Sequence, residues 1–198
     1  MKRLITSAAV LLIAAQMAVA GFNIGPRIGL NFANVSDKNV DYDMRVGFQG
    51  GLQAEFTLLN IIGVQSGVLY TTKGAKMDLL GVESSLKPSY LEVPVNGVFK
   101  LNLIVADIVF LTGPYFAWGI GGTTTAEVLG KEVTSDIEWG DGIGQQKRFD
   151  FGWNFGAGVG LLGLQVTAQY GLGITNMSNV DKLKATNSVF SLAAAYMF

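Results

Sequence analysis

The chain has 198 residues, of which 49% are hydrophobic and only 15% carry a charge. Soluble domains carry a charge on about a quarter of their residues, so much of this protein's surface must be apolar. The chain has no histidine and no cysteine, which excludes disulfides and removes the usual general base, the commonest metal ligand and Cys–His nucleophiles. The composition therefore predicts no enzymatic activity, no cofactor and no bound metal.

The first 20 residues are predicted to be a secretory signal peptide for the Sec pathway. Lys2 and Arg3 give a positive start to an apolar run that extends to Ala15. Ala18-Val19-Ala20 then supplies the small residues of a cleavage site. An uncleaved anchor helix is the alternative, and the shortness of the apolar run disfavours it. Cleavage leaves residues 21–198 as one domain with 12 basic and 15 acidic side chains, which argues against a nucleic-acid partner.

Apolar and polar residues alternate through most of this domain, which is typical of β-strands with one apolar and one polar face. The alternation predicts eight strands, at residues 22–32, 44–58, 61–72, 89–101, 106–120, 148–161, 164–175 and 188–198. Such segments match the roughly 9–11 residues that cross a bilayer at a tilt. The pattern leaves open which side faces outward in residues 61–72 and 106–120. Pro94 predicts a bulge or local break in the fourth strand.

The connections between these strands alternate in length. Tight turns are expected at Asn60, at residues 102–105 and at residues 162–163, whereas long polar connections are expected at residues 33–43, 73–88, 121–147 and 176–187. Outer-membrane barrels have short periplasmic turns and long extracellular loops. The predicted fold is therefore all-β: an eight-stranded, antiparallel, up-and-down transmembrane β-barrel in the cell outer membrane, preceded by a cleaved signal peptide.

The glycine-rich stretch at residues 158–163, GVGLLG, matches the spacing of a dinucleotide-binding loop. That loop requires a helix directly after the glycines, because the helix N-terminus holds the phosphate. The next residues, 164–170, alternate apolar and polar instead. The stretch is thus interpreted as the end of one strand and its turn into the next.

Five charged residues on the polar strand faces are expected to form a structural network in the barrel lumen: Arg27, Glu55, Glu92, Lys100 and Asp150. An eight-stranded barrel is just wide enough inside for its side chains, so buried charges there must be paired. Arg27 is expected to pair with Glu55 or Glu92, and the filled lumen is expected not to conduct ions.

Three alternatives to a purely structural interior stay open. Two lumen carboxylates could serve a glycosidase. Inward glycines in residues 148–161 and 164–175 could leave a ligand cavity, but the favoured interpretation is that they permit curvature and make room for long side chains opposite. Asp136, Glu138 and Asp141 could hold a divalent cation, but an ordinary solvated loop is the favoured interpretation.

The last strand alternates strictly and ends on aromatic residues. Tyr196 and Phe198 resemble the C-terminal signature that the outer-membrane barrel-assembly machinery recognises. We therefore interpret these two residues as an assembly signal, with that machinery and the outer-membrane lipids as expected partners.

Two stretches resemble one known family. Residues 90–95, YLEVPV, followed by Phe99-Lys100, are similar to the "Y-L-E-[IV]-P" strand of the PorT-like outer-membrane β-barrel family of Bacteroidetes-type bacteria. Residues 151–160 and 170–176 resemble the glycine-rich strand pair of the same family. The resemblance implies the barrel fold and the outer-membrane location, and it supplies no catalytic motif. The member that names the family belongs to a protein-secretion apparatus.

The expected function is that of a small non-enzymatic barrel, which acts as a structural or interaction protein through its long extracellular loops. Envelope or secretion proteins are the expected protein partners. The alternatives are transport of a small solute through the barrel, a secreted lipocalin-like carrier of an apolar ligand, and a lipid-modifying enzyme. A soluble carrier would point its apolar residues inward, and the lack of histidine disfavours the enzyme.

Overall fold

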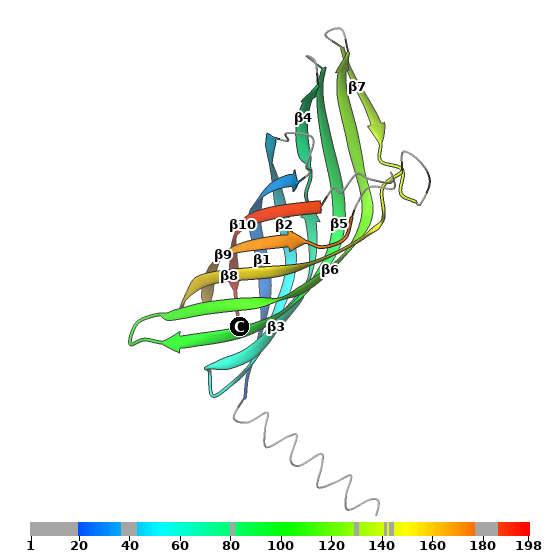
Figure 1. The fold of residues 1–198 in the computed structure, drawn as a ribbon. Coiled ribbons are helices and arrows are strands. Elements are labelled where there is room, and N and C mark those ends of the chain that lie inside the picture. Colours follow the sequence, from blue (N-terminus) through cyan, green and yellow to red (C-terminus); the bar gives the residue numbers. More distant parts are fainter. Residues whose placement is uncertain are drawn as a thin grey trace, which may run out of the picture.

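The computed structural model describes residues 20–36, 43–79, 82–128, 131–140, 142, 145–176 and 186–198. These residues form one antiparallel β-sheet (Figure 1). No helix in this part of the chain is long and apolar enough to cross a membrane. The predicted signal peptide lies outside the described residues except for Ala20, so its cleavage stays a prediction.

The strands follow one another in chain order around the sheet. They are β1 (Ala20–Ser36), β2 (Asp43–Leu58), β3 (Ile62–Thr72), β4 (Ala75–Leu79), β5 (Val82–Asn102), β6 (Asp107–Val128), β7 (Lys131–Asp136), β8 (Phe149–Leu161), β9 (Leu164–Gly173) and β10 (Thr186–Tyr196). Leaving out β4 and β7, each strand pairs with the next, and β10 pairs back with β1. The predicted eight-stranded antiparallel barrel is confirmed.

Two of the predicted long loops are in fact largely strand. β4 pairs with the first residues of β5, and the last residues of β6 pair with β7. Both hairpins extend the sheet beyond the barrel, at the top of Figure 1. The prediction of loops at residues 73–88 and 121–147 was wrong there, because strands that leave the bilayer need no apolar face. They therefore lack the alternation that identifies a membrane-crossing strand.

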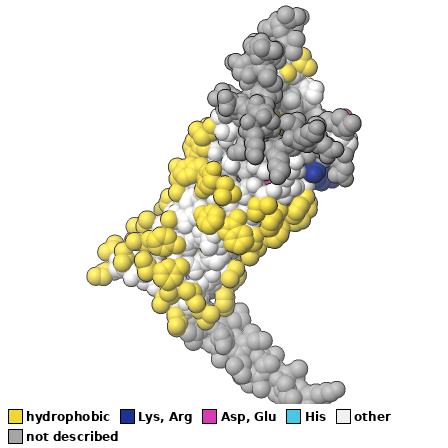
Figure 2. All heavy atoms as spheres, viewed as in Figure 1, with side chains coloured by type: hydrophobic (Ala, Val, Ile, Leu, Met, Phe, Trp, Pro, Cys, Tyr) yellow, Lys and Arg dark blue, Asp and Glu magenta, His cyan; other side chains and the backbone are white. Residues whose placement is uncertain are grey.

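The facing of the side chains follows the predicted pattern. Ile28 is 69% exposed on the outer surface, while its neighbour Arg27 is 3% exposed inside. Figure 2 shows hydrophobic side chains gathered in a broad band over the described part of the barrel. The two strands whose outward side the sequence left open also alternate: Gln65 and Thr71 of β3 point inward, and so does Tyr115 of β6. The outer face is thus suited to lipid and the inner face is mainly polar.

Aromatic rings on the outer face lie toward both ends of the membrane-crossing strands. Ring pairs toward the hairpin end are Phe32–Phe190, Phe48–Tyr70, Phe116–Phe151 and Trp118–Phe149. At the opposite end Tyr196 packs edge-on against Phe198 at 5.0 Å. Outer-membrane barrels place such aromatic girdles at the two membrane interfaces.

The tight turns have the mirror-image backbone that suits the right-handed twist of paired strands. Leu59 and Asn60 have φ of 51° and 54°, and Leu162 and Gly163 have φ of 51° and 84°. GVGLLG is therefore the end of β8 and its turn into β9, as interpreted. The predicted break at Pro94 is also confirmed, because the pairing of β3 with β5 stops at Ser66–Val95 and resumes at Leu69–Glu92.

Replacing Leu52 with arginine tests the facing of the strands. Leu52 is exposed on the outer face of β2, and an arginine near the bilayer midplane costs about 2–4 kcal/mol. We expect Leu52→Arg to lower the free energy of unfolding by that amount in urea titrations of protein folded into lipid vesicles. The control Leu52→Ile should stay within about 1.5 kcal/mol of the wild type. Equal stability of the arginine variant and the control would contradict the assigned facing.

Candidate functional site: the barrel interior

Three charged side chains meet inside the barrel at the side of the hairpins; we call Lys73, Glu92 and Asp150 the hairpin-side cluster. Lys73 Nζ lies 2.8 Å from Glu92 Oε2 and 3.1 Å from Asp150 Oδ2. Its ammonium also lies 4.1 Å from the centre of the Tyr115 ring. Asn187 donates to Asp150 Oδ2 at 2.9 Å. One buried lysine therefore pairs with two carboxylates, of which Asp150 is fully buried and Glu92 is 13% exposed.

A second ion pair lies toward the tight turns; we call Glu55 and Lys100 the turn-side pair. Lys100 Nζ donates to Glu55 Oε1, and Glu55 is 1% exposed. The other carboxylate oxygen, Oε2, accepts from Gln65 at 3.0 Å and from Gln165 at 3.3 Å. Each oxygen of this buried carboxylate thus has a donor, which is what a buried charge requires.

Arg27 lies between these two groups and forms no ion pair with the residues that the structure describes. Its guanidinium donates to Gln53 Oε1 at 2.7 Å and to Gln169 Oε1 at 2.6 Å. The expected pairing of Arg27 with Glu55 or Glu92 is therefore wrong. The two carboxylates are already held by Lys100 and Lys73, and neutral amide oxygens accept from the guanidinium instead.

The sequence reasoning missed Lys73, which was assigned to a loop. Lys73 directly follows β3 and continues its inward series, two residues after Thr71. Extending the inward series of residues 65, 67, 69 and 71 by one step, to residue 73, would have identified it. The five predicted lumen residues Arg27, Glu55, Glu92, Lys100 and Asp150 all point into the barrel. Hydrogen bonds through Gln53 and Gln165 join Arg27 to Glu55 and Lys100, whereas Glu92 and Asp150 meet at Lys73.

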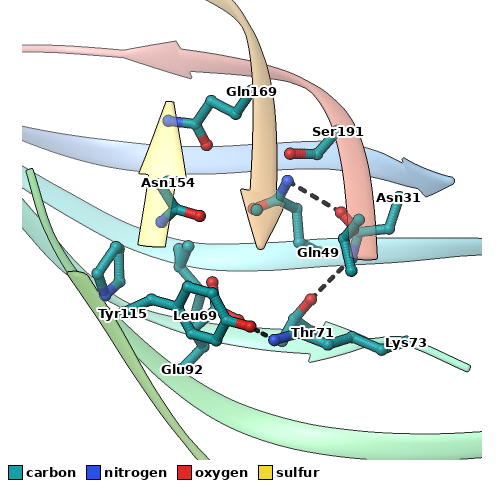
Figure 3. A pocket seen from close by; sticks show the side chains of 13 residues that line it. Asn31, Gln49, Leu69, Thr71, Lys73, Glu92, Tyr115, Asn154, Gln169 and Ser191 are labelled. Carbon is teal, nitrogen blue, oxygen red and sulfur yellow. Dashed lines mark hydrogen bonds and ion pairs between the residues drawn. The ribbon is translucent and has the colours of Figure 1, made fainter. Parts of the chain in front are cut away.

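Amides and hydroxyls fill the space beside the hairpin-side cluster (Figure 3). Asn31 donates to Thr71 Oγ1 at 2.7 Å, and Gln49 donates to Asn31 Oδ1 at 3.1 Å. The pocket that these side chains line with Lys73 and Glu92 has a volume of about 20 Å³, enough for about one water molecule. A sugar cannot enter it, so Glu92 and the residues around it do not form a glycosidase substrate site.

The inward glycines make room for long side chains. A Cβ at Gly152 would lie 2.5 Å from the Tyr115 ring, and one at Gly156 would lie 2.7 Å from Gln169 Cγ. This favours the interpretation that the glycines accommodate opposite side chains, and no ligand cavity opens at either position.

An aromatic side chain from outside the barrel strands covers the hairpin side of the lumen. Trp139 follows β7 and packs edge-on against Tyr90, with ring centres 5.6 Å apart. Tyr90 belongs to a buried apolar cluster with Tyr115 and Ala117. A Cβ at Gly119 would overlap the Trp139 ring, so this glycine provides the space for it. The sequence of the predicted loop at residues 121–147 did not indicate that Trp139 would pack over the lumen.

The alternative of a cation site at Asp136, Glu138 and Asp141 gains no support from the described residues. No group of three or more acidic side chains capable of holding a metal occurs among them. Asp136 and Glu138 are exposed, and Asp141 lies outside the described part of the chain.

Removing Lys73 should destabilise the barrel more than removing any exposed charge. Lys73→Met leaves the fully buried Asp150 and the partly buried Glu92 without their cation, so we expect the free energy of unfolding to fall by about 3–5 kcal/mol. Urea titration in lipid vesicles measures it, with the exposed Lys87→Met as the control, expected within about 0.5 kcal/mol. Adding Glu92→Gln and Asp150→Asn should recover most of the loss. A Lys73→Met variant as stable as the control would contradict the paired arrangement.

Comparisons with known proteins agree with this architecture. The sequence matches the family model of the outer membrane protein beta-barrel domain over residues 14–179. Solved structures that resemble the chain include Ail, the attachment invasion locus protein of Yersinia pestis, with 18% identity, a TM-score of 0.49 and coverage of 89% of this chain and 98% of that one. Neisserial surface protein A has 12% identity, a TM-score of 0.46 and coverage of 90% and 99%. A search of the curated proteins found no match. Because the family model covers most of the sequence, the chain belongs to the outer membrane protein beta-barrel domain family and lies in the outer membrane.

Proposed function

We propose that this protein is a non-enzymatic surface interaction protein that binds its partners through the two hairpins outside the barrel. The supporting observation is the length of the paired strands. β5 and β6 have 21 and 22 residues and stay paired from Asn102–Asp107 to Ser84–Ala126. Crossing a bilayer takes roughly 9–11 residues, so about half of this ladder stands in the extracellular space.

The projecting sheet offers an open edge for a partner. β7 pairs with β6 on one side and with no strand of the described chain on the other. Its residues 132–136 are exposed. Free N–H and C=O groups on such an edge can pair with an extended segment of another protein. Function at the hairpins is therefore binding, and it requires no catalytic group.

The lumen in this proposal is plugged. The hairpin-side cluster, the Arg27 amides and the turn-side pair occupy successive levels of the interior, and Trp139 covers the hairpin side. Eight-stranded barrels have room for little more than their own side chains. The barrel then serves as an anchor for the hairpins, and solute transport is the disfavoured alternative.

The similarity of residues 90–95 to the PorT-like family supports a narrower form of the proposal. In that form the hairpins bind proteins of a secretion or surface-assembly system. Those residues occupy β5, which continues into the projecting sheet.

The plugged lumen predicts a lack of conductance. Purified protein inserted into planar bilayers should show no stable open state, because no continuous water path passes the buried ion pairs. A 16-stranded porin inserted under the same conditions provides the positive control. Regular ohmic channels from the pure protein would move solute transport ahead of the binding function.

Shortening the β6–β7 hairpin tests the binding function. Thr123 pairs with Asp136, so replacing residues 124–135 with Asn-Gly closes the ladder with a favoured two-residue turn. The variant should still fold, seen as different gel mobility of boiled and unboiled samples. We expect cross-linked complexes isolated from native outer membrane with the wild type to be lost with the variant. The control Val133→Thr keeps the hairpin and should keep the complexes; their persistence with the shortened hairpin would overturn the proposal.

A further inference from the structure

The barrel end opposite the hairpins has an unusual surface. Each of its three tight connections presents an aliphatic side chain to solvent: Leu59 is 67% exposed, Leu162 is 90% exposed and Ile104 is fully exposed. Turn positions normally carry Gly, Asn, Asp or Ser. We call Leu59, Ile104 and Leu162 the apolar tips. Three exposed aliphatic tips at one end of the molecule indicate a surface that another molecule covers.

The backbone strengthens this interpretation. Leu59 and Leu162 both have φ of 51°, in the left-handed region. That region costs a residue with a Cβ about 1–2 kcal/mol relative to the right-handed one, and Asn or Gly is preferred there in two-residue turns. A leucine at these positions therefore works against the stability of the turn. Strain of this kind, at a residue that is mostly exposed, points to a role in binding.

A polar cavity opens between the tips. Its volume is about 490 Å³, and its lining includes the turn-side pair Glu55 and Lys100 together with Asp107 and Asn60. Lys100 already pairs with Glu55, and the Asp107 carboxylate has no side-chain partner among the described residues. The cavity, which we call the vestibule, thus carries one negative charge that forms no ion pair with a basic side chain of the described residues.

The composition of this end favours a protein over a lipid surface. Residues 54–66, 97–112, 156–170 and 190–198 belong to this end of the barrel. Lys100 is the only basic residue among them, and its side chain points inward to Glu55. Basic side chains that would bind lipid phosphates are therefore missing from these stretches. Immersion of the tips in lipid would also bring the mouth of the vestibule, with Asp107, against hydrocarbon, which is costly for a charge.

We propose that the turn end docks a periplasmic protein, which places a lysine or arginine side chain in the vestibule beside Asp107 and packs apolar residues on the tips. A buried charge surrounded by apolar contacts that exclude water is the usual anatomy of a protein interface. This site lies at the opposite end from the hairpins, and it does not depend on what they bind.

Three amidated, N-acetylated tripeptides serve as probes: Leu-Lys-Leu, Leu-norleucine-Leu and Leu-Glu-Leu. Amide resonances of isotope-labelled protein in lipid nanodiscs are followed during titration, with empty nanodiscs correcting for lipid binding. We expect Leu-Lys-Leu to shift the resonances of Asp107, Gly160 and Gly163, and to bind about tenfold more tightly than the norleucine peptide. Equal affinity of all three peptides, or no shift at these residues, would overturn the proposal.

Two variants test separately the contributions of the Asp107 charge and of the apolar tips to peptide binding. Asp107→Asn should reduce the affinity for Leu-Lys-Leu to that for the norleucine peptide, whereas the control Asp136→Asn, on β7, should leave it unchanged. The double variant Leu59→Asn, Leu162→Asn should unfold at the same or a higher urea concentration than the wild type, because Asn suits the left-handed turn. It should bind both the lysine and the norleucine peptides several-fold more weakly. Unchanged binding by this stable variant contradicts docking on the tips.

A spin label decides between protein docking and lipid immersion. The chain has no cysteine, so Ile104→Cys places a single nitroxide at the longest tip. We expect its relaxation to respond to a water-soluble nickel complex. The control Val159→Cys, on the outer face of β8, should respond to oxygen, which concentrates in lipid. A label at residue 104 that behaves like the one at residue 159 would assign the tips to the bilayer and overturn the proposal.

Discussion

The structure depends on the pairing of its first and last barrel strands. Arg27 lies opposite Ala195 in this ladder, and the pairing continues to Ser36–Thr186. Within a bilayer no water is present to bind an unpaired backbone group, so a sheet that crosses the membrane must close. Closure fixes the other features of the barrel: every strand has one face toward lipid and one toward the lumen, and the lumen is shared by side chains far apart in the sequence.

Because the lumen is closed and narrow, its polar side chains have mainly each other as partners. The carboxylates satisfy this requirement with lysines that stand near the ends of their strands, Lys73 and Lys100. Arg27, in the middle of the barrel, uses the amide oxygens of Gln53 and Gln169. The carboxylates are thus paired where lysines can reach, and the amides of Gln53 and Gln165 connect Arg27 to Glu55.

The two ends of the barrel differ because they meet different environments. On the hairpin side the strands continue into water, polar on both faces, and present an open strand edge. On the turn side the connections are as short as the geometry permits, and yet they carry leucine and isoleucine at exposed positions. The asymmetry is one of chemistry as well as length, and it gives the protein two distinct surfaces outside the membrane.

The sequence by itself determined the number of barrel strands, the facing of most side chains and the tight turns at residues 59–60 and 162–163. These features reflect the contrast between lipid and lumen. Successive residues of a strand face one and then the other, so apolar and polar residues alternate along the sequence. Only the tertiary structure decided which charges meet, since Lys73 and Asp150 are 77 residues apart and the tilt and stagger of the strands select cross-barrel neighbours. The sequence did not predict the projecting hairpins, because a strand with water on both faces shows no alternation of apolar and polar residues. It did not predict the position of Trp139 either, because the fold of a distant segment places that side chain over the lumen.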